Sequence, residues 1–253
     1  MISKSIKIVG GFLVLFSGIA SAVDLTAISA INKSVYRVTW EKPEGRSFMG
    51  TGFVVENSKG EPVVLTAGHL IQAGLRVGGK LMLWGFYPEE SMRETSVLSY
   101  KVEQGLNFVV SDWMQGDPLT ENSFPLNMDD YGTLKSPTNV VAPLKLSKTA
   151  AAVGDPLYIF CCERSDHLKV VEVKCVGNFR GKIGYCPPLG PGASGSPVLN
   201  KNGQVVGMVV SLAGRLGYAA DLTTLEVVLG FRAPPPPKNQ SSLPVPGFPL
   251  LPQ

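Results

Sequence analysis

The feature that most constrains this chain is an alternation, from about residue 25 to residue 232, of short β-branched or aromatic runs with turn signals. Such runs favour strands because these side chains suit a pleated, half-buried surface. The tetrapeptides Asn57-Ser58-Lys59-Gly60 and Asn200-Lys201-Asn202-Gly203 are typical of tight turns between antiparallel strands. We therefore expect an all-β fold. The expected strands are residues 35–40, 52–55, 63–66, 80–84, 157–160, 169–173, 195–199 and 204–210.

The remaining segments of the body predict little helix. Residues 222–229 alone have a helical pattern, and residues 91–129 have weak periodicity that predicts long loops. Many short strands with one late helix indicate a barrel or a sandwich. A charged fraction of 17% and 28 glycines exclude a long-helix or coiled-coil protein, in which Ala, Glu, Lys and Leu dominate.

The N-terminal residues 1–22 predict a cleavable secretory signal. Lys4 and Lys7 precede an apolar run over residues 8–19, and Ala20-Ser21-Ala22 has the small residues of a cleavage site. The signal predicts a secreted or periplasmic protein without a stable membrane anchor after cleavage; an uncleaved anchor is the alternative. Loss of the two lysines lowers the formal net charge of +3 by two. So small a charge gives no reason to expect a nucleic-acid partner.

The C-terminal residues 233–253 predict a tail outside the folded unit. Pro234-Pro235-Pro236-Pro237 is followed by four more prolines, which favour extended polyproline II conformations over a packed element. We interpret the segment as a disordered, solvated tail; a ligand for a partner or a spacer is the alternative. The expected organisation is a signal at 1–22, one folded unit at 23–232 and a tail at 233–253.

Two short motifs carry candidate catalytic side chains. His69 ends Thr66-Ala67-Gly68-His69, directly after an expected strand, where a side chain can be presented at the rim of a barrel. Ser194 lies in Gly192-Ala193-Ser194-Gly195-Ser196-Pro197, whose small residues let the backbone turn sharply and expose the hydroxyl. Each motif alone is weak, but together, in this order and at this spacing, they are specific.

These motifs resemble those of the trypsin-like, or chymotrypsin-fold, serine peptidases, especially the bacterial glutamyl-endopeptidase-like and Deg-type branch. Gly50-Thr51-Gly52-Phe53-Val54-Val55 is similar to the glycine-rich strand that precedes the family's His motif. Softer similarities lie at Val153-Gly154-Asp155-Pro156-Leu157 and Gly217-Tyr218-Ala219-Ala220. The resemblance implies two packed six-stranded antiparallel β-barrels, a crossing between them near residues 136–143, and a short C-terminal helix.

The resemblance also implies a Ser-His-Asp triad of Ser194, His69 and Asp130. Asp130 is followed by Tyr131-Gly132-Thr133-Leu134, which fits the family's pattern best, although Thr133 replaces an apolar residue. Asp129 is the adjacent alternative, and Asp112 and Asp117 fit less well. The order of the motifs excludes an α/β-hydrolase, which places its Ser before its Asp and His.

Further roles follow from the same resemblance. The backbone N–H groups of Gly192 and Ser194 are the expected oxyanion hole, and Val209, Val210 and Ser211 are expected to bind substrate. Neither a metal nor a cofactor is required. Val209 stands where glutamyl endopeptidases carry a His, and no acidic residue lies near Pro188, so neither an acidic nor a basic substrate residue is favoured. A small or apolar residue before the cleaved bond is the weak expectation that remains.

The cysteines and the second histidine have simpler interpretations. Cys161, Cys162, Cys175 and Cys186 allow three disulfide pairings, and Cys162–Cys175 with Cys161–Cys186 is conceivable in an exported protein. Buried free thiols and a structural zinc site are the alternatives. His167 follows Ser165-Asp166 and is interpreted as a solvated turn residue.

The sequence therefore predicts an exported serine endopeptidase that acts on protein or peptide substrates. A catalytically inactive trypsin-fold protein that binds peptides or proteins is the first alternative, because the third triad member is the least secure. A peptide-binding adaptor acting through the Pro-rich tail is the second.

Overall fold

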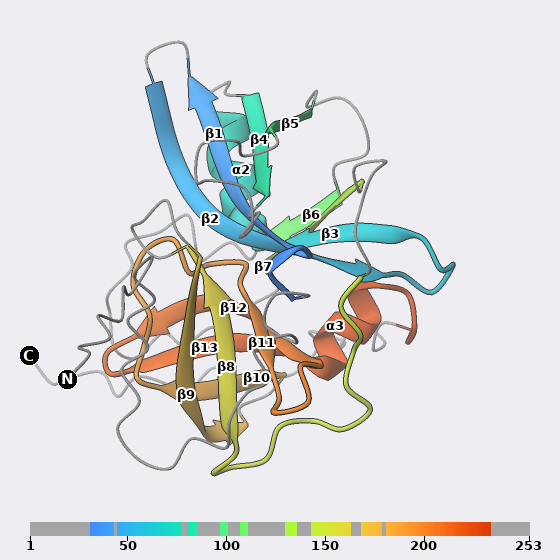
Figure 1. The fold of residues 1–253 in the computed structure, drawn as a ribbon, viewed down its shortest axis with the longest axis vertical. Coiled ribbons are helices and arrows are strands. Elements are labelled where there is room, and N and C mark those ends of the chain that lie inside the picture. The colour runs from blue at the N-terminus through green and yellow to red at the C-terminus, as the bar shows by residue number, and fades with distance from the viewer. Residues whose placement is uncertain are drawn as a thin grey trace, which may run out of the picture.

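The computed structural model describes residues 31–42, 45–76, 80–85, 97–100, 107–110, 130–135, 143–162, 168–178 and 181–233. Within these residues the chain forms two antiparallel β structures, one from each half of the sequence (Figure 1). The predicted all-β class is confirmed. The predicted signal at 1–22, nearly all of the tail at 233–253 and His167 lie outside the described residues.

The N-terminal half is a seven-stranded sheet in the order β5-β4-β1-β2-β3-β7-β6. The family resemblance implied a six-stranded barrel here, whereas the described residues form this longer sheet. Two of its strands, β5 and β6, fall in the region where long loops were expected. The strands are β1 (Val35–Lys42), β2 (Gly45–Glu56), β3 (Pro62–Thr66), β4 (Lys80–Gly85), β5 (Val97–Tyr100), β6 (Asn107–Val110) and β7 (Asp130–Lys135).

The C-terminal half is a closed barrel in the order β10-β13-β12-β11-β8-β9. The expected strands at 157–160, 169–173 and 204–210 each lie within a strand or overlap most of one. Strand β11 starts two residues later than expected, because Gly195 and Ser196 belong to a turn. The strands are β8 (Pro156–Cys161), β9 (Lys169–Asn178), β10 (Lys182–Cys186), β11 (Pro197–Leu199), β12 (Val205–Ala213) and β13 (Leu216–Asp221).

In the described part of the chain, helices α2 and α3 accompany the strands. The late helix is present as α3 (Leu222–Val228), capped by the Asp221 carboxylate, which accepts a hydrogen bond from the Thr224 N–H at 2.9 Å. Helix α2 (Gly68–Arg76) was not predicted, and it begins at the residue before His69. The expectation of a single late helix is therefore wrong in this respect.

A shared apolar core joins the two halves. Phe53 and Leu65 of the sheet pack in one buried cluster with Phe160 and Met208 of the barrel. The segment that leads from one half to the other is bonded to both: the Leu144 N–H donates to the Val54 carbonyl at 2.8 Å, and the Lys145 carbonyl accepts from the Val205 N–H at 2.9 Å. The relative position of the two halves is thus fixed by packing and by backbone hydrogen bonds.

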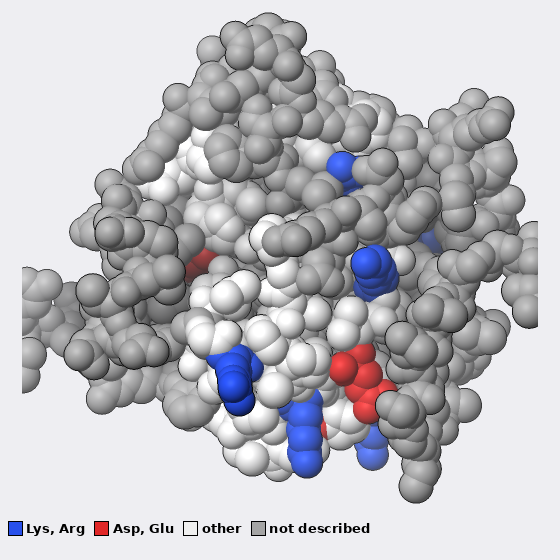
Figure 2. All heavy atoms as spheres, turned by 90° about the vertical axis from the view of Figure 1, so that its left-hand side faces the viewer, with Lys and Arg blue, Asp and Glu red and all other residues white. Residues whose placement is uncertain are grey.

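The described surface carries scattered charge. On the face drawn in Figure 2, Lys and Arg side chains stand apart from one another, with acidic side chains and uncharged surface between them. The described part of the chain contains no helix long and apolar enough to cross a bilayer.

Candidate active site

His69 and Asp130 come together because of the register between two strands. Strand β3 ends at Thr66, which pairs with Gly132 of β7. In an antiparallel pair, the position two residues after Thr66 stands opposite the residue two positions before Gly132. Asp130, the first residue of β7, therefore stands opposite the start of α2, where His69 lies.

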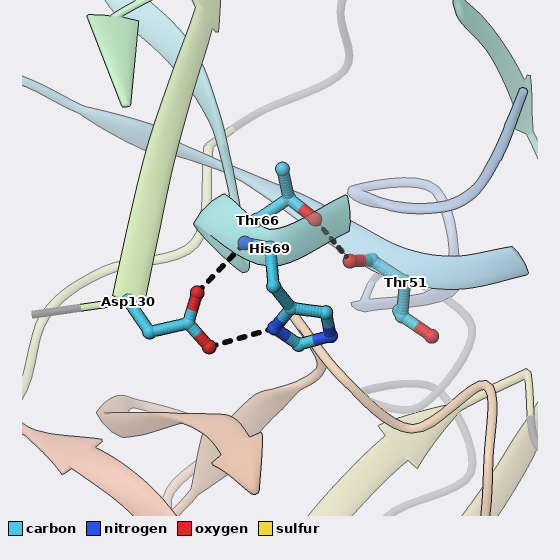
Figure 3. A network of polar contacts seen from close by, with 4 residues as sticks. All are labelled: Thr51, Thr66, His69 and Asp130. Atoms are coloured by element: carbon cyan, nitrogen blue, oxygen red, sulfur yellow. Dashed lines mark hydrogen bonds and ion pairs between the residues drawn. The ribbon is translucent and has the colours of Figure 1, made fainter. Parts of the chain in front are cut away.

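The carboxylate of Asp130 makes two contacts with His69 (Figure 3). Its Oδ2 lies 2.7 Å from Nδ1 of the imidazole, and its Oδ1 accepts the His69 backbone N–H at 2.8 Å. The Asp130 side chain is 1% exposed and the His69 side chain 23%. An ionised carboxylate only accepts hydrogen bonds, so in the neutral imidazole Nδ1 is the donor and Nε2 carries the free lone pair. Of the candidate aspartates, Asp112, Asp117 and Asp129 lie outside the described residues.

The loop that carries Ser194 consists of two consecutive tight turns. The Ala193 N–H donates to the Gly190 carbonyl at 3.2 Å, and the Ser196 N–H donates to the Ala193 carbonyl at 3.0 Å. The third residue of each turn is a glycine with positive φ, 99° at Gly192 and 81° at Gly195. Type II turns require a positive φ at this position, which glycine adopts at least cost. The Gly-x-Ser-Gly motif therefore has a local backbone explanation.

The Ser194 loop is fastened to both halves of the molecule. On the barrel side, the Gly195 N–H donates to the Val209 carbonyl at 2.7 Å. On the sheet side, the Thr51 N–H donates to the Ser194 carbonyl at 2.8 Å. A Cβ on Gly195 would overlap the Thr51 carbonyl oxygen and would lie 2.5 Å from Oγ1 of Thr66, three residues before His69. The structure thus brings the Ser194 loop against the strand ends that precede His69.

Two threonines that the motif analysis did not single out hold this arrangement. Oγ1 of Thr66 donates to the Thr51 carbonyl at 2.7 Å (Figure 3). Oγ1 of Thr51 donates to the Gly192 carbonyl at 2.9 Å. Both side chains are fully buried. Their presence inside the two motifs, Gly50-Thr51-Gly52 and Thr66-Ala67-Gly68-His69, was the only sequence signal for them.

The backbone N–H groups of Gly192 and Ser194 bear on what this loop can do chemically. Within the described residues, neither group donates to a protein acceptor, and neither is used by the two turns. Ser194 is partly exposed. The loop therefore presents a hydroxyl beside two available donors, which is the composition of a site for acyl transfer.

Comparison with known proteins identifies the family. The family model described as the trypsin-like peptidase domain matches residues 50–208, which is more than half of the chain and includes the motifs of His69 and Ser194. The chain belongs to the trypsin-like peptidase family. Family membership identifies the protein as a serine-type peptidase. No sequence among the curated proteins matches the chain.

Solved structures of serine proteases share the fold. A serine endoprotease from Yersinia pestis matches with a TM-score of 0.59 and 14% identity, over 85% of this chain and 67% of that one. Deg5 matches with a TM-score of 0.56 and 14% identity, over 80% of this chain and 90% of that one. The active form of the Rv3671c protease from M. tuberculosis matches with a TM-score of 0.54 and 18% identity, over 82% and 84% of the two chains.

The segment expected to bind substrate in this family lies on β12. Val209 is buried, and besides accepting from Gly195 it donates its N–H to the Ser196 carbonyl at 2.9 Å. The side chain of Val210 is also buried, at an irregularity in the pairing of β12 with β13. Ser211 is partly exposed, and Leu212 after it is 53% exposed. The backbone of Val209 therefore serves the Ser194 loop, and the accessible side chains of this strand begin at Ser211.

The four cysteines lie outside the motifs that contain His69 and Ser194. None of the four forms a disulfide, so the pairing of Cys162 with Cys175 and of Cys161 with Cys186 is not present. Among the described residues, no group of three or more His, Cys, Asp or Glu is placed to hold a metal ion. Burial raises the pKa of the Cys162 thiol to about 12, so it is protonated at neutral pH and is a poor nucleophile.

Proposed function

We propose that this chain is an exported serine endopeptidase that uses Ser194 as nucleophile, His69 as general base and Asp130 as the residue that orients His69. The observation that carries the proposal is the pair of contacts between Asp130 and His69, at 2.7 and 2.8 Å, in a site against which the Ser194 loop is fastened. The fold of the neighbouring protease structures supports the same roles.

The proposed reaction follows from these positions. As Oγ of Ser194 bonds to the acyl carbon of a peptide, its proton passes to Nε2 of His69. Asp130 stabilises the imidazolium that forms. The oxygen of the tetrahedral intermediate accepts hydrogen bonds from the N–H groups of Gly192 and Ser194. The C–N bond then breaks, His69 gives its proton to the leaving amine, and a water molecule releases the acyl group by the same steps.

A fluorophosphonate probe tests the proposed nucleophile. We expect the purified mature protein to be labelled and the Ser194→Ala variant to lose the label, because phosphonylation requires an activated serine hydroxyl. Ser196→Ala is the matched control: its hydroxyl is fully buried two residues away and has no hydrogen-bond partner in the described structure. We expect this variant to keep the label and to digest casein as the unmodified protein does.

Two outcomes would count against the proposal. A folded wild-type protein that takes no label and leaves casein intact would favour the alternative, an inactive trypsin-fold protein that binds peptides. A label that survives in Ser194→Ala would assign the nucleophile to another residue.

Export is proposed from the sequence of residues 1–22. The two lysines, the apolar run and the Ala20-Ser21-Ala22 site support cleavage after Ala22. We expect N-terminal sequencing of the protein recovered from the periplasm or medium to begin at Val23. A chain that keeps Met1 and stays with the membrane fraction would instead identify the segment as an anchor.

A further inference from the structure

Thr51 lies where the sheet meets the Ser194 loop, and all of its polar groups are used. Its N–H donates to the Ser194 carbonyl at 2.8 Å, and its carbonyl accepts from Thr66 Oγ1 at 2.7 Å. Its hydroxyl donates to the Gly192 carbonyl at 2.9 Å and accepts the Cys162 N–H at 3.2 Å. The residue is fully buried, so water does not compete for these bonds. One side chain thus joins the sheet, the barrel and the Ser194 loop.

The two carbonyls that Thr51 holds lie on either side of Ala193. The Gly192 carbonyl is held by the hydroxyl, and the Ser194 carbonyl is held by the backbone N–H. Gly192 has a φ of 99°, and glycine rotates between backbone conformations at low cost. Without the hydroxyl, the Gly192–Ala193 peptide would keep only the bond from the Ala193 N–H to the Gly190 carbonyl, and the Gly192 carbonyl would be left buried without a partner.

On the barrel side, this part of the loop packs against apolar side chains. Ala193 is 1% exposed and packs in the apolar cluster of the barrel with Leu189 and Val209. The Ala193 methyl group contributes packing but has no hydrogen-bonding atom, so it does not orient the neighbouring peptide planes. The directional contacts to the two carbonyls that flank Ala193 therefore come from Thr51.

We propose that Thr51 is a positioning residue for the oxyanion hole. Its hydroxyl fixes the Gly192–Ala193 peptide, and so keeps the N–H groups of Gly192 and Ser194 directed at the oxygen of the reacting acyl group. The inference rests on the proposed function of Ser194. Because the hydroxyl is fully buried and bonds to Gly192 and Cys162 rather than to His69, it acts on the stabilisation of the transition state and leaves proton transfer by His69 unchanged.

Steady-state hydrolysis of p-nitrophenyl acetate tests this role, with Thr51→Val as the main variant. Valine keeps the shape of threonine but lacks the hydroxyl. We expect kcat to fall by about 10- to 100-fold, less than the about 10²- to 10³-fold that follows removal of an oxyanion donor itself. We expect KM and the shape of the pH–rate profile to stay within the error of the wild type. Thr51→Ser restores the hydroxyl, and we expect kcat within about threefold of the wild type.

Thr39→Val is the matched control. Thr39 is equally buried on the neighbouring strand β1, and its hydroxyl accepts a hydrogen bond from Nε1 of Trp84 at 2.7 Å, away from the Ser194 loop. This variant also loses one buried hydroxyl, and we expect its kcat to be unchanged. If Thr51→Val does not fold, Thr51→Ala compared with Thr51→Ser makes the same test, because these two side chains differ only by the hydroxyl.

The outcomes separate this inference from the function on which it rests. A wild-type protein that is labelled by fluorophosphonate, together with a Thr51→Val variant of unchanged kcat, overturns the role of Thr51 alone. An equal loss of kcat in Thr39→Val shows a general effect of stability and also overturns it. A folded wild-type protein that is neither labelled nor active overturns the proposed function, and the role of Thr51 with it.

Discussion

Replacing Asp130 by asparagine is expected to lower kcat by about 10⁴-fold. The two contacts of Asp130 explain why. An amide at this position would place its oxygen toward the His69 backbone N–H and its NH₂ toward Nδ1, where Oδ1 and Oδ2 now accept at 2.8 and 2.7 Å. Nδ1 would then have to accept a hydrogen bond, which moves the ring proton to Nε2. The nitrogen that should receive the Ser194 proton would already carry one.

The rates of fluorophosphonate labelling and of p-nitrophenyl acetate hydrolysis measure this effect. Asp155→Asn is the control for the chemical change itself. Asp155 is exposed, and within the part of the chain that the structure describes its carboxylate accepts the Ala152 N–H alone, at 2.8 Å. We expect this variant to react at the wild-type rate. If Asp130→Asn also reacts at that rate while His69→Ala does not, His69 works without Asp130 and the proposed triad is wrong.

Replacing Gly195 by alanine is expected to destabilise the protein by more than about 3 kcal/mol and to abolish labelling of Ser194. Two costs add at this residue. A φ of 81° is unfavourable for any residue with a Cβ. The new Cβ would also overlap the Thr51 carbonyl oxygen, which cannot retreat because it accepts the Thr66 hydroxyl at 2.7 Å. The strain would move the adjacent Ser194.

Urea unfolding separates these two costs when Gly154→Ala is measured in parallel. Gly154 has a φ of 97°, and a Cβ there would meet no atom within 4 Å. This variant bears the conformational cost alone, about 1 to 2 kcal/mol, and should keep its activity. Equal losses of stability in the two variants would contradict the close packing of Gly195 against Thr51.

The strands could be predicted because their side chains follow a local rule. The β-branched runs of β1, β3 and β12 are half or fully buried, and composition alone indicates this.

Helix α2 was not predicted because glycine in a helix interior costs about 1 kcal/mol relative to alanine, which lowered the apparent helical preference of a short segment. Gly74 is required there by packing, since a Cβ would overlap the indole of Trp40. The spacing of Ala67, Leu70, Ile71 and Gly74 is the helical pattern that could have revealed it.

The motifs that contain His69 and Ser194 could be predicted from the sequence, but the contacts that Asp130 and Thr51 make with them could not. His69 and Ser194 lie in motifs in which local sequence fixes the backbone. The choice of Asp130 over Asp129 depends on strand register, because a shift of one residue turns a side chain to the other face of the sheet. Thr51 belongs to a strand whose sequence predicts only a strand. Its contacts with Gly192 and Cys162 join residues 141 and 111 positions apart, and no local pattern reports them.

The pairing of β3 with β7 also bears on the length of chain between His69 and Asp130. His69 and Asp130 are 61 positions apart in the sequence. Their contact nevertheless depends only on the pairing of Thr66 with Gly132 and on the few residues between each of these and the contact. A doubling of a loop between the strands of the intervening segment would add only about 0.6 kcal/mol of closure entropy. Relatives of this chain are therefore free to lengthen the connections between β4, β5, β6 and β7, and a search for their catalytic aspartate should align the strand and ignore the count of residues before it.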